Sequence, residues 1–87
     1  MIQKVIDAID QVVEEIYTAE QARLQVYYIA FMDAFSAFLD DMAKMGYTVD
    51  MTEDLQKMQQ ALTIKDYILL SDILLYEVRP DFVDLLE

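Results

Sequence analysis

The sequence predicts an all-α fold, a small antiparallel four-helix bundle, on the basis of three observations. The chain has 87 residues but only one Gly and one Pro, which leaves little material for the turns of an all-β fold. Its apolar residues recur at steps of three and four rather than in strict alternation. The length suits one hydrophobic core, so we expect residues 1–87 to form a single helical domain.

The first predicted helix has apolar residues that recur from Ile2 onward, with its polar residues on the side opposite this apolar face. Many of its apolar residues are β-branched, which lowers helix propensity. A half-buried strand would alternate apolar and polar residues strictly, however, and this segment does not. The apolar face consists of Ile2, Val5, Ile6, Ile9, Val12, Val13 and Ile16.

A break is predicted at about Tyr17–Ala19. Thr18 and Gln21 have the spacing of a capping box, and the apolar face changes phase at the same place. Neither Gly nor Pro enforces this break. One continuous helix from residue 2 to residue 45 is therefore the alternative.

The second predicted helix, from about residue 19 to residue 45, has the widest apolar arc of the chain. We expect it to be the long central helix, with the first and fourth helices packed along it. Gly46 suits the left-handed position that ends many helices. A strip of small residues, Ala30, Ala34 and Ala37, lies beside the main face. That face consists of Leu24, Tyr28, Phe31, Phe35, Phe38 and Met42.

Residues 47–51 connect this helix to a short third helix, for which Thr52 is the expected cap. Glu53 and Asp54 occupy the first turn, where the helix dipole favours negative charge. The apolar face of the third helix is Leu55, Met58 and Leu62. This helix is expected to close one end of the bundle.

The fourth predicted helix has Asp66 as its cap and extends from Tyr67 to about Arg79. Pro80 cannot occupy a regular helix interior without loss of a hydrogen bond. It either kinks this helix or begins a last turn that continues through Leu86.

Composition excludes several classes of function. A net charge of −11, from 17 acids and 6 bases, repels phosphate and anionic lipid, so neither nucleic acid nor membrane is an expected partner. The chain has no Cys and no His, and therefore lacks thiolate chemistry and the commonest general base and metal ligand. We expect a non-enzyme with no cofactor and no catalytic or metal-binding residue. Asp7 and Asp10 interrupt any signal-peptide core, and no apolar run suits a membrane span, so a cytoplasmic location is expected.

Glu77 is the most conspicuous polar residue of the fourth helix, because it falls on the apolar face with Leu70, Ile73 and Leu74. A buried carboxylate needs a partner or a raised pKa. Glu77, with Tyr76 beside it, is therefore a candidate buried polar site. The expected role is a structural ion pair or a tyrosine hydrogen bond, and partner recognition is the alternative.

A second apolar strip on the fourth helix is the main functional hint. Ile68, Leu75 and Phe82 recur at seven-residue spacing, beside Asp72. A helix at the edge of a small bundle buries one face, so a second apolar face predicts a dimer seam or a site for a partner helix. The strip has an acidic rim at Asp72 and Asp81. In a symmetric dimer, Arg79 from the other subunit would neutralise this rim. The alternative is that these are ordinary exposed apolar side chains.

The segment from Ala61 to Pro80 resembles the C-terminal stretch of a group of small, acidic, helical bacterial proteins. The shared pattern is Lys-Asp-Tyr-x-Leu-Leu-x-Asp-x-Leu-x-Tyr-Glu-x-x-Pro, which begins here at Lys65. The resemblance covers about 20 residues and brings no activity, but it places Tyr76, Glu77 and Pro80 within the family pattern. In architecture alone, the chain is also similar to small helical export chaperones of the flagellar and secretion type.

These observations favour a non-enzymatic protein-interaction module, a chaperone-like or regulatory adaptor that works as a homodimer or with a helical protein partner. The alternative is a helical bundle that binds a small ligand or a metal through tyrosines and carboxylates. A third hypothesis is an acidic mimic of nucleic acid that occupies a basic protein surface.

Overall fold

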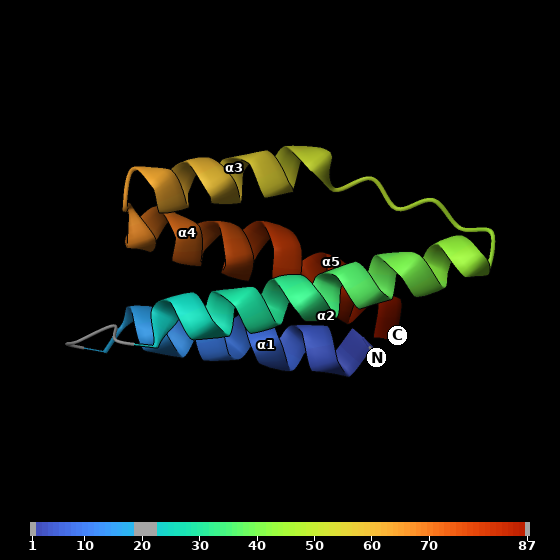
Figure 1. Ribbon diagram of the computed structural model, residues 1–87, viewed down its shortest axis with the longest axis horizontal. Helices are drawn as coiled ribbons and strands as arrows, with labels where there is room; N and C mark the ends of the chain where they lie inside the picture. The colour runs from blue at the N-terminus through green and yellow to red at the C-terminus, as the bar shows by residue number, and fades with distance from the viewer. Residues whose placement is uncertain (1, 19–22, 87) are drawn as a thin grey trace.

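The computed structural model describes residues 2–18 and 23–86, and all regular structure in this part of the chain is helical. The all-α prediction is confirmed. The described residues form four helical rods, of which the last is a continuous run of three helical segments (Figure 1). The elements are α1 (Ile2–Ile16), α2 (Leu24–Lys44), α3 (Thr52–Thr63), α4 (Tyr67–Ile73), the π-helical turn η1 (Leu74–Val78) and α5 (Arg79–Leu86).

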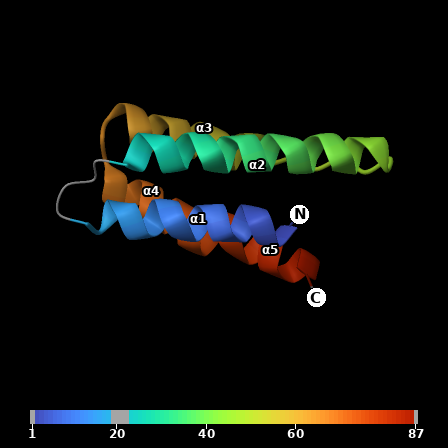
Figure 2. The same cartoon turned by 60° about the horizontal axis from the view of Figure 1, so that its bottom comes forward.

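Successive rods run in opposite directions, as expected for an antiparallel bundle, and α1 begins at the same end of the bundle at which α5 finishes (Figures 1 and 2). α1 lies beside α2 and also beside α4, η1 and α5. Within the described residues, the backbone of α2 comes close to that of α1 alone. α1 and the fourth rod each lie beside two other rods, whereas α2 lies beside one, so the expectation that the second helix is central was wrong.

Side-chain size explains this arrangement. α1 buries β-branched residues such as Val5, Ile9 and Val12, which let neighbouring backbones approach closely. α2 instead uses long aromatic side chains, whose rings reach across to α5 while the two backbones stay apart. α3 packs along α4 and η1, and does not close an end of the bundle (Figure 1).

The predicted break between the first two helices is confirmed, because α1 ends at Ile16 and α2 runs back beside it. The Thr18 hydroxyl donates to the backbone oxygen of Glu15 (2.8 Å), and so serves the end of α1. The Glu15 carboxylate accepts from the backbone N–H of Arg23 (2.9 Å), just before α2. Gln21, the other half of the predicted capping box, lies outside the described residues.

Two of the three predicted helix caps are found in the structure. Gly46 has a φ of 84°, the left-handed conformation predicted for the end of α2. Asp66 caps α4, because its carboxylate accepts from the backbone N–H of Leu69 (3.1 Å). Thr52 is the first residue of α3 rather than its cap. Asp50 accepts its backbone N–H instead (3.1 Å), and this hydrogen bond lowers the pKa of Asp50 below 3.8.

The core is built around four phenylalanines. Phe31, Phe35 and Phe38 are buried along α2, as predicted. Phe82 from α5 joins them, with its ring edge-on to Phe35 (centroids 5.8 Å apart) and to Phe38 (5.1 Å). Such edge-to-face pairs stabilise a core beyond the area that they bury. These contacts tie α2 to α5 across the bundle.

The π-helical turn η1 explains how Phe82 reaches the core. The fourth rod buries Leu70, Leu74, Val78 and Phe82, which recur at steps of four. In a regular α-helix each such step overshoots a full turn by about 40°, so three steps would carry Phe82 well away from Leu70. A π turn takes in one extra residue and cancels most of this drift.

Pro80 accounts for the position of the π turn. A proline ring clashes with the carbonyl four residues earlier in a regular α-helix, and proline offers no N–H to that carbonyl. Pro80 is the second residue of α5, so the expanded turn falls directly before it. Arg79, at the junction, keeps α-helical dihedral angles (φ −56°, ψ −45°), and the rod continues to Leu86 without interruption.

Removal of a core ring tests this packing. Phe35→Ala and Phe82→Ala should each lower the free energy of unfolding by about 3–5 kcal/mol, because each deletes a buried ring and leaves a cavity. The control Tyr76→Ala removes a ring that is 75% exposed and should change it by less than about 0.5 kcal/mol. Denaturant unfolding followed by circular dichroism measures all three. A loss below about 1 kcal/mol for Phe82→Ala would contradict its place in the core.

Candidate functional site

The apolar strip predicted on the fourth helix does not form as a whole. Ile68 is 57% exposed, Leu75 is half-buried, and Phe82 is fully buried in the core. The seven-residue spacing assumed a regular α-helix, whereas η1 inserts a residue between Leu75 and Phe82. The prediction that Phe82 lies on an exposed face was therefore wrong, and Ile68 and Leu75 lie apart from it.

The two charged residues of that strip have different surroundings. Asp72 is exposed on α4. Arg79 points to α1, where its Nε donates to Oδ1 of Asp10 (2.8 Å) and its Nη2 donates to Oδ2 (3.3 Å). This two-pronged pair raises the pKa of the Arg79 guanidinium. Arg79 thus holds the fourth rod against α1 within one chain, instead of pairing with a carboxylate of a second subunit.

Glu77 and Tyr76 are exposed, contrary to the prediction that they are buried. The Glu77 side chain is 41% exposed and accepts a hydrogen bond from Nζ of Lys57 on α3 (3.1 Å). The expected ion pair exists, but it lies at the surface, where it also raises the pKa of Lys57. The cause is again η1, which turns Val78 into the core position that a regular helix would give to Glu77.

The buried polar residue of this rod is Ser71. It is fully buried among the described side chains, and its Oγ lies 3.1 Å from the hydroxyl oxygen of Tyr17, just after α1. This hydrogen bond satisfies a hydroxyl that would be costly to bury alone. The sequence analysis did not identify Ser71 and missed this structural role.

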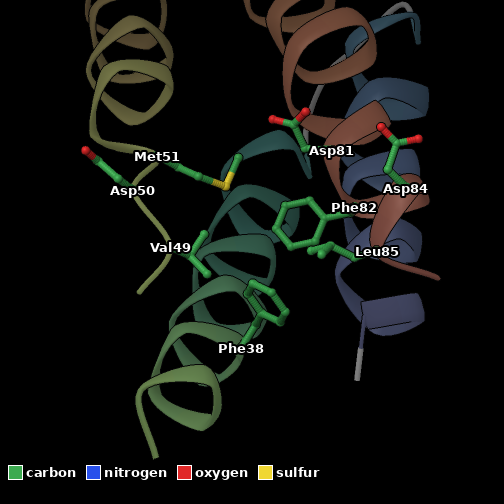
Figure 3. Close-up of a pocket in the computed structure, with 8 residues that line it drawn as sticks. All are labelled: Phe38, Val49, Asp50, Met51, Asp81, Phe82, Asp84 and Leu85. Atoms are coloured by element: carbon green, nitrogen blue, oxygen red, sulfur yellow. The ribbon is translucent and has the colours of Figure 1, made fainter. Parts of the chain in front are cut away.

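A half-open apolar pocket lies where α5 meets α2 and the 47–51 connection (Figure 3). Its volume is about 290 Å³. Phe38 and Phe82 form its inner wall, and the Met51 side chain extends towards Phe82 (Figure 3). Val49 and Leu85 complete the apolar lining. The inward turn of Phe82 therefore builds this pocket as well as the core.

Carboxylates form the rim of the pocket. Asp81 and Asp84 come from α5 and Asp50 comes from the connection, and all three are exposed. The ion pairs among the described residues use Lys57 and Arg79, and neither reaches a rim acid. The rim therefore keeps its negative charge beside an apolar wall.

Further acids extend this negative field along α3. The pKa of Asp54 is raised above 3.8, first by partial burial and then by the nearby charges of Glu77 and Asp81. Lys57 opposes this effect but is shared with Glu77 and Glu53 (3.6 Å). The contribution of Glu77 and Asp81 to the raised pKa shows that their negative charges reach Asp54.

The arrangement of this pocket suits the binding of a ligand. In the ranges 2–18 and 23–86, no group of three or more carboxylates is placed to hold a metal ion. The metal-binding part of the alternative hypothesis therefore has no candidate site there. An apolar wall beside unneutralised acids suits a ligand that carries an apolar group and positive charge together.

Sequence reasoning identified Phe38 as core and Asp81 as part of an acidic rim, but missed the pocket. Val49 and Met51 lie in a connection with no helical period, so no pattern placed them against α5. Their apolar character within a short connection was the available signal.

Within the described residues, none of the helices combines the length and the apolar character that a membrane-spanning segment requires. Comparison with curated proteins and with solved structures gives no match. A family model described as Domain of unknown function (DUF8042) matches residues 1–87.

Asp54→Asn should change how stability depends on pH. Because the fold raises the pKa of Asp54, the folded state holds this proton more tightly than the unfolded chain does, and ionised Asp54 lowers stability. The Asn variant should therefore be more stable than the wild type at neutral pH. This difference in stability is lost as the pH falls through the raised pKa of Asp54 and below the ordinary value of 3.8. Thermal melts of both proteins at neutral pH and at about pH 3 test this. An advantage that is equal or larger in acid would contradict it.

Proposed function

We propose that this chain, which belongs to the family of domains of unknown function matched over residues 1–87, is a non-enzymatic protein-interaction module. The observation that carries the proposal is the apolar pocket with its rim of unneutralised acids. Exposed apolar surface that is bordered by polar groups is typical of sites where other molecules bind. A chaperone-like or regulatory adaptor, working in the cytoplasm, fits these properties.

The size of the pocket favours a protein partner over a small ligand. Pockets that enclose small molecules commonly measure about 300–1,000 Å³ and bury most of the ligand. The present pocket, at about 290 Å³ and half open, lies just below that range. It suits one or two side chains that project from a larger surface, which is how interaction sites hold their anchor residues.

Charge favours a different protein over a second copy of this chain. The chain carries a net charge of −11, and a symmetric contact through the pocket would bring Asp81 and Asp84 of two copies together. Like charges at an interface oppose association. The same charge argues against nucleic acid and anionic membrane as partners, while a mimic of nucleic acid would also need a basic partner but no apolar pocket.

Site-specific photo-crosslinking tests the proposal. A photoreactive amino acid in place of Leu85, an exposed residue of the pocket wall, should give a protein adduct in extracts of the native cells. The matched control replaces Val26, which is also exposed but lies on α2 and outside the pocket lining, and should give none.

The captured protein, once purified, should increase the mass of the wild-type chain in light scattering. Equal adducts at both positions, or no protein adduct at Leu85, would contradict an interaction site at the pocket.

A further inference from the structure

The occupant of the pocket can be specified by its chemistry. Resting on the proposed function, we infer that the partner presents a basic segment that places one large apolar side chain against Val49, Met51 and Leu85, above the buried rings of Phe38 and Phe82. Lys or Arg residues on both sides of that anchor meet Asp50, Asp81 and Asp84.

The pocket wall specifies the anchor. The buried rings of Phe38 and Phe82 form the floor of the pocket, and its accessible apolar surface belongs to half-buried Val49 and Met51 and exposed Leu85. Met51 adds a flexible thioether that can adjust to the shape of a side chain (Figure 3). A single inserted Leu, Met or aromatic residue buries enough apolar area to dominate such a contact. The half-open mouth leaves room for the backbone that carries the anchor.

The rim specifies the flanking charges. Asp81 and Asp84 are three residues apart on α5, so their side chains lie on neighbouring positions of one helix face. Asp50 belongs to the connection that faces α5 across the pocket, and its carboxylate lies away from that of Asp84 (Figure 3). The rim of the pocket therefore carries carboxylates on two sides, with that of Asp50 directed outward (Figure 3). A segment with basic residues on each side of an apolar residue matches this pattern.

No segment within residues 1–87 has this pattern. The six bases of the sequence are scattered, and no two of them are closer than eight residues apart, so none of its apolar residues has a base close on each side. We therefore look for the basic segment in a partner molecule. Its affinity should combine an apolar part that salt leaves intact and a charged part that salt weakens.

The experiment uses a short synthetic helical peptide of Ala and Lys with one central Leu. The chain is labelled at its methionine methyl groups, so that NMR reports on Met51 in the pocket wall. Met58, fully buried on α3, is the internal control. The peptide should shift the Met51 signal and leave the Met58 signal unchanged. A peptide with Glu in place of Lys should give no shift, and one with Ala in place of Leu should bind at least about tenfold more weakly.

The matched variants test the rim. Asp81→Lys with Asp84→Lys should weaken binding by about tenfold or more, because two attractions become repulsions. The control, Asp33→Lys with Asp40→Lys, changes the net charge by the same amount but at exposed positions of α2. It should weaken peptide binding far less than the Asp81 and Asp84 variant does. Asp81→Asn with Asp84→Asn serves if the Lys double variant melts at a lower temperature than the wild type. Equal weakening by both pairs, or no response at Met51, would overturn the inference.

Two further outcomes separate this inference from the proposed function. If spermine alone shifts Met51 as strongly as the peptide does, the ligand is a small polyamine and the inference is wrong. If a protein crosslinks at Leu85 through a segment without basic residues, the inference fails while the interaction module stands. If the peptide binds at Met51 but no cellular protein crosslinks at Leu85, the chemistry of the pocket holds and the proposed function fails.

Discussion

The single extra residue in the π-helical turn η1 is the constraint on which the rest of the structure depends. It lets the fourth rod bury side chains at steps of four, from Leu70 to Phe82, along one face. Phe82 then closes the phenylalanine cluster with Phe35 and Phe38. The same change of phase turns Glu77 towards α3 and Arg79 towards α1, so both ion pairs of this rod follow from it.

The candidate site is a further consequence of this turn. With Phe82 inside, its neighbour Asp81 and the residue one turn later, Asp84, come to the surface beside an apolar wall. The 47–51 connection supplies the other side of the pocket, because Met51 packs against the core instead of extending into solvent. The molecule thereby places apolar surface and uncompensated negative charge together, which is the combination that the proposed interaction requires.

The sequence predicted those parts of the fold that follow regular periodicity. The apolar faces of α1 and α2, the break after Ile16 and the Asp66 cap all depend on local spacing, which a single sequence reveals. The exposed strip through Phe82 and the buried Glu77 were wrong because a projection at constant pitch cannot represent an inserted residue. Pro80 was the visible signal of that irregularity, but its effect on the preceding turn depends on tertiary packing. The pocket depends on contacts between a connection and a distant helix, which no local pattern specifies.

Deletion of one residue measures the central claim most directly. Tyr76 is exposed within η1, and its removal leaves spacings of four, three and four between the buried residues from Leu70 to Phe82, which is the pattern of a regular α-helix. The deletion should therefore leave a cooperatively folded, fully helical protein, as judged by circular dichroism and thermal melting. Deletion of Ser36, an exposed residue in the middle of α2, should abolish cooperative folding, because it rotates Phe38 out of the core by about 100°. Equal damage from the two deletions would show that the π turn is not the origin of the inward position of Phe82.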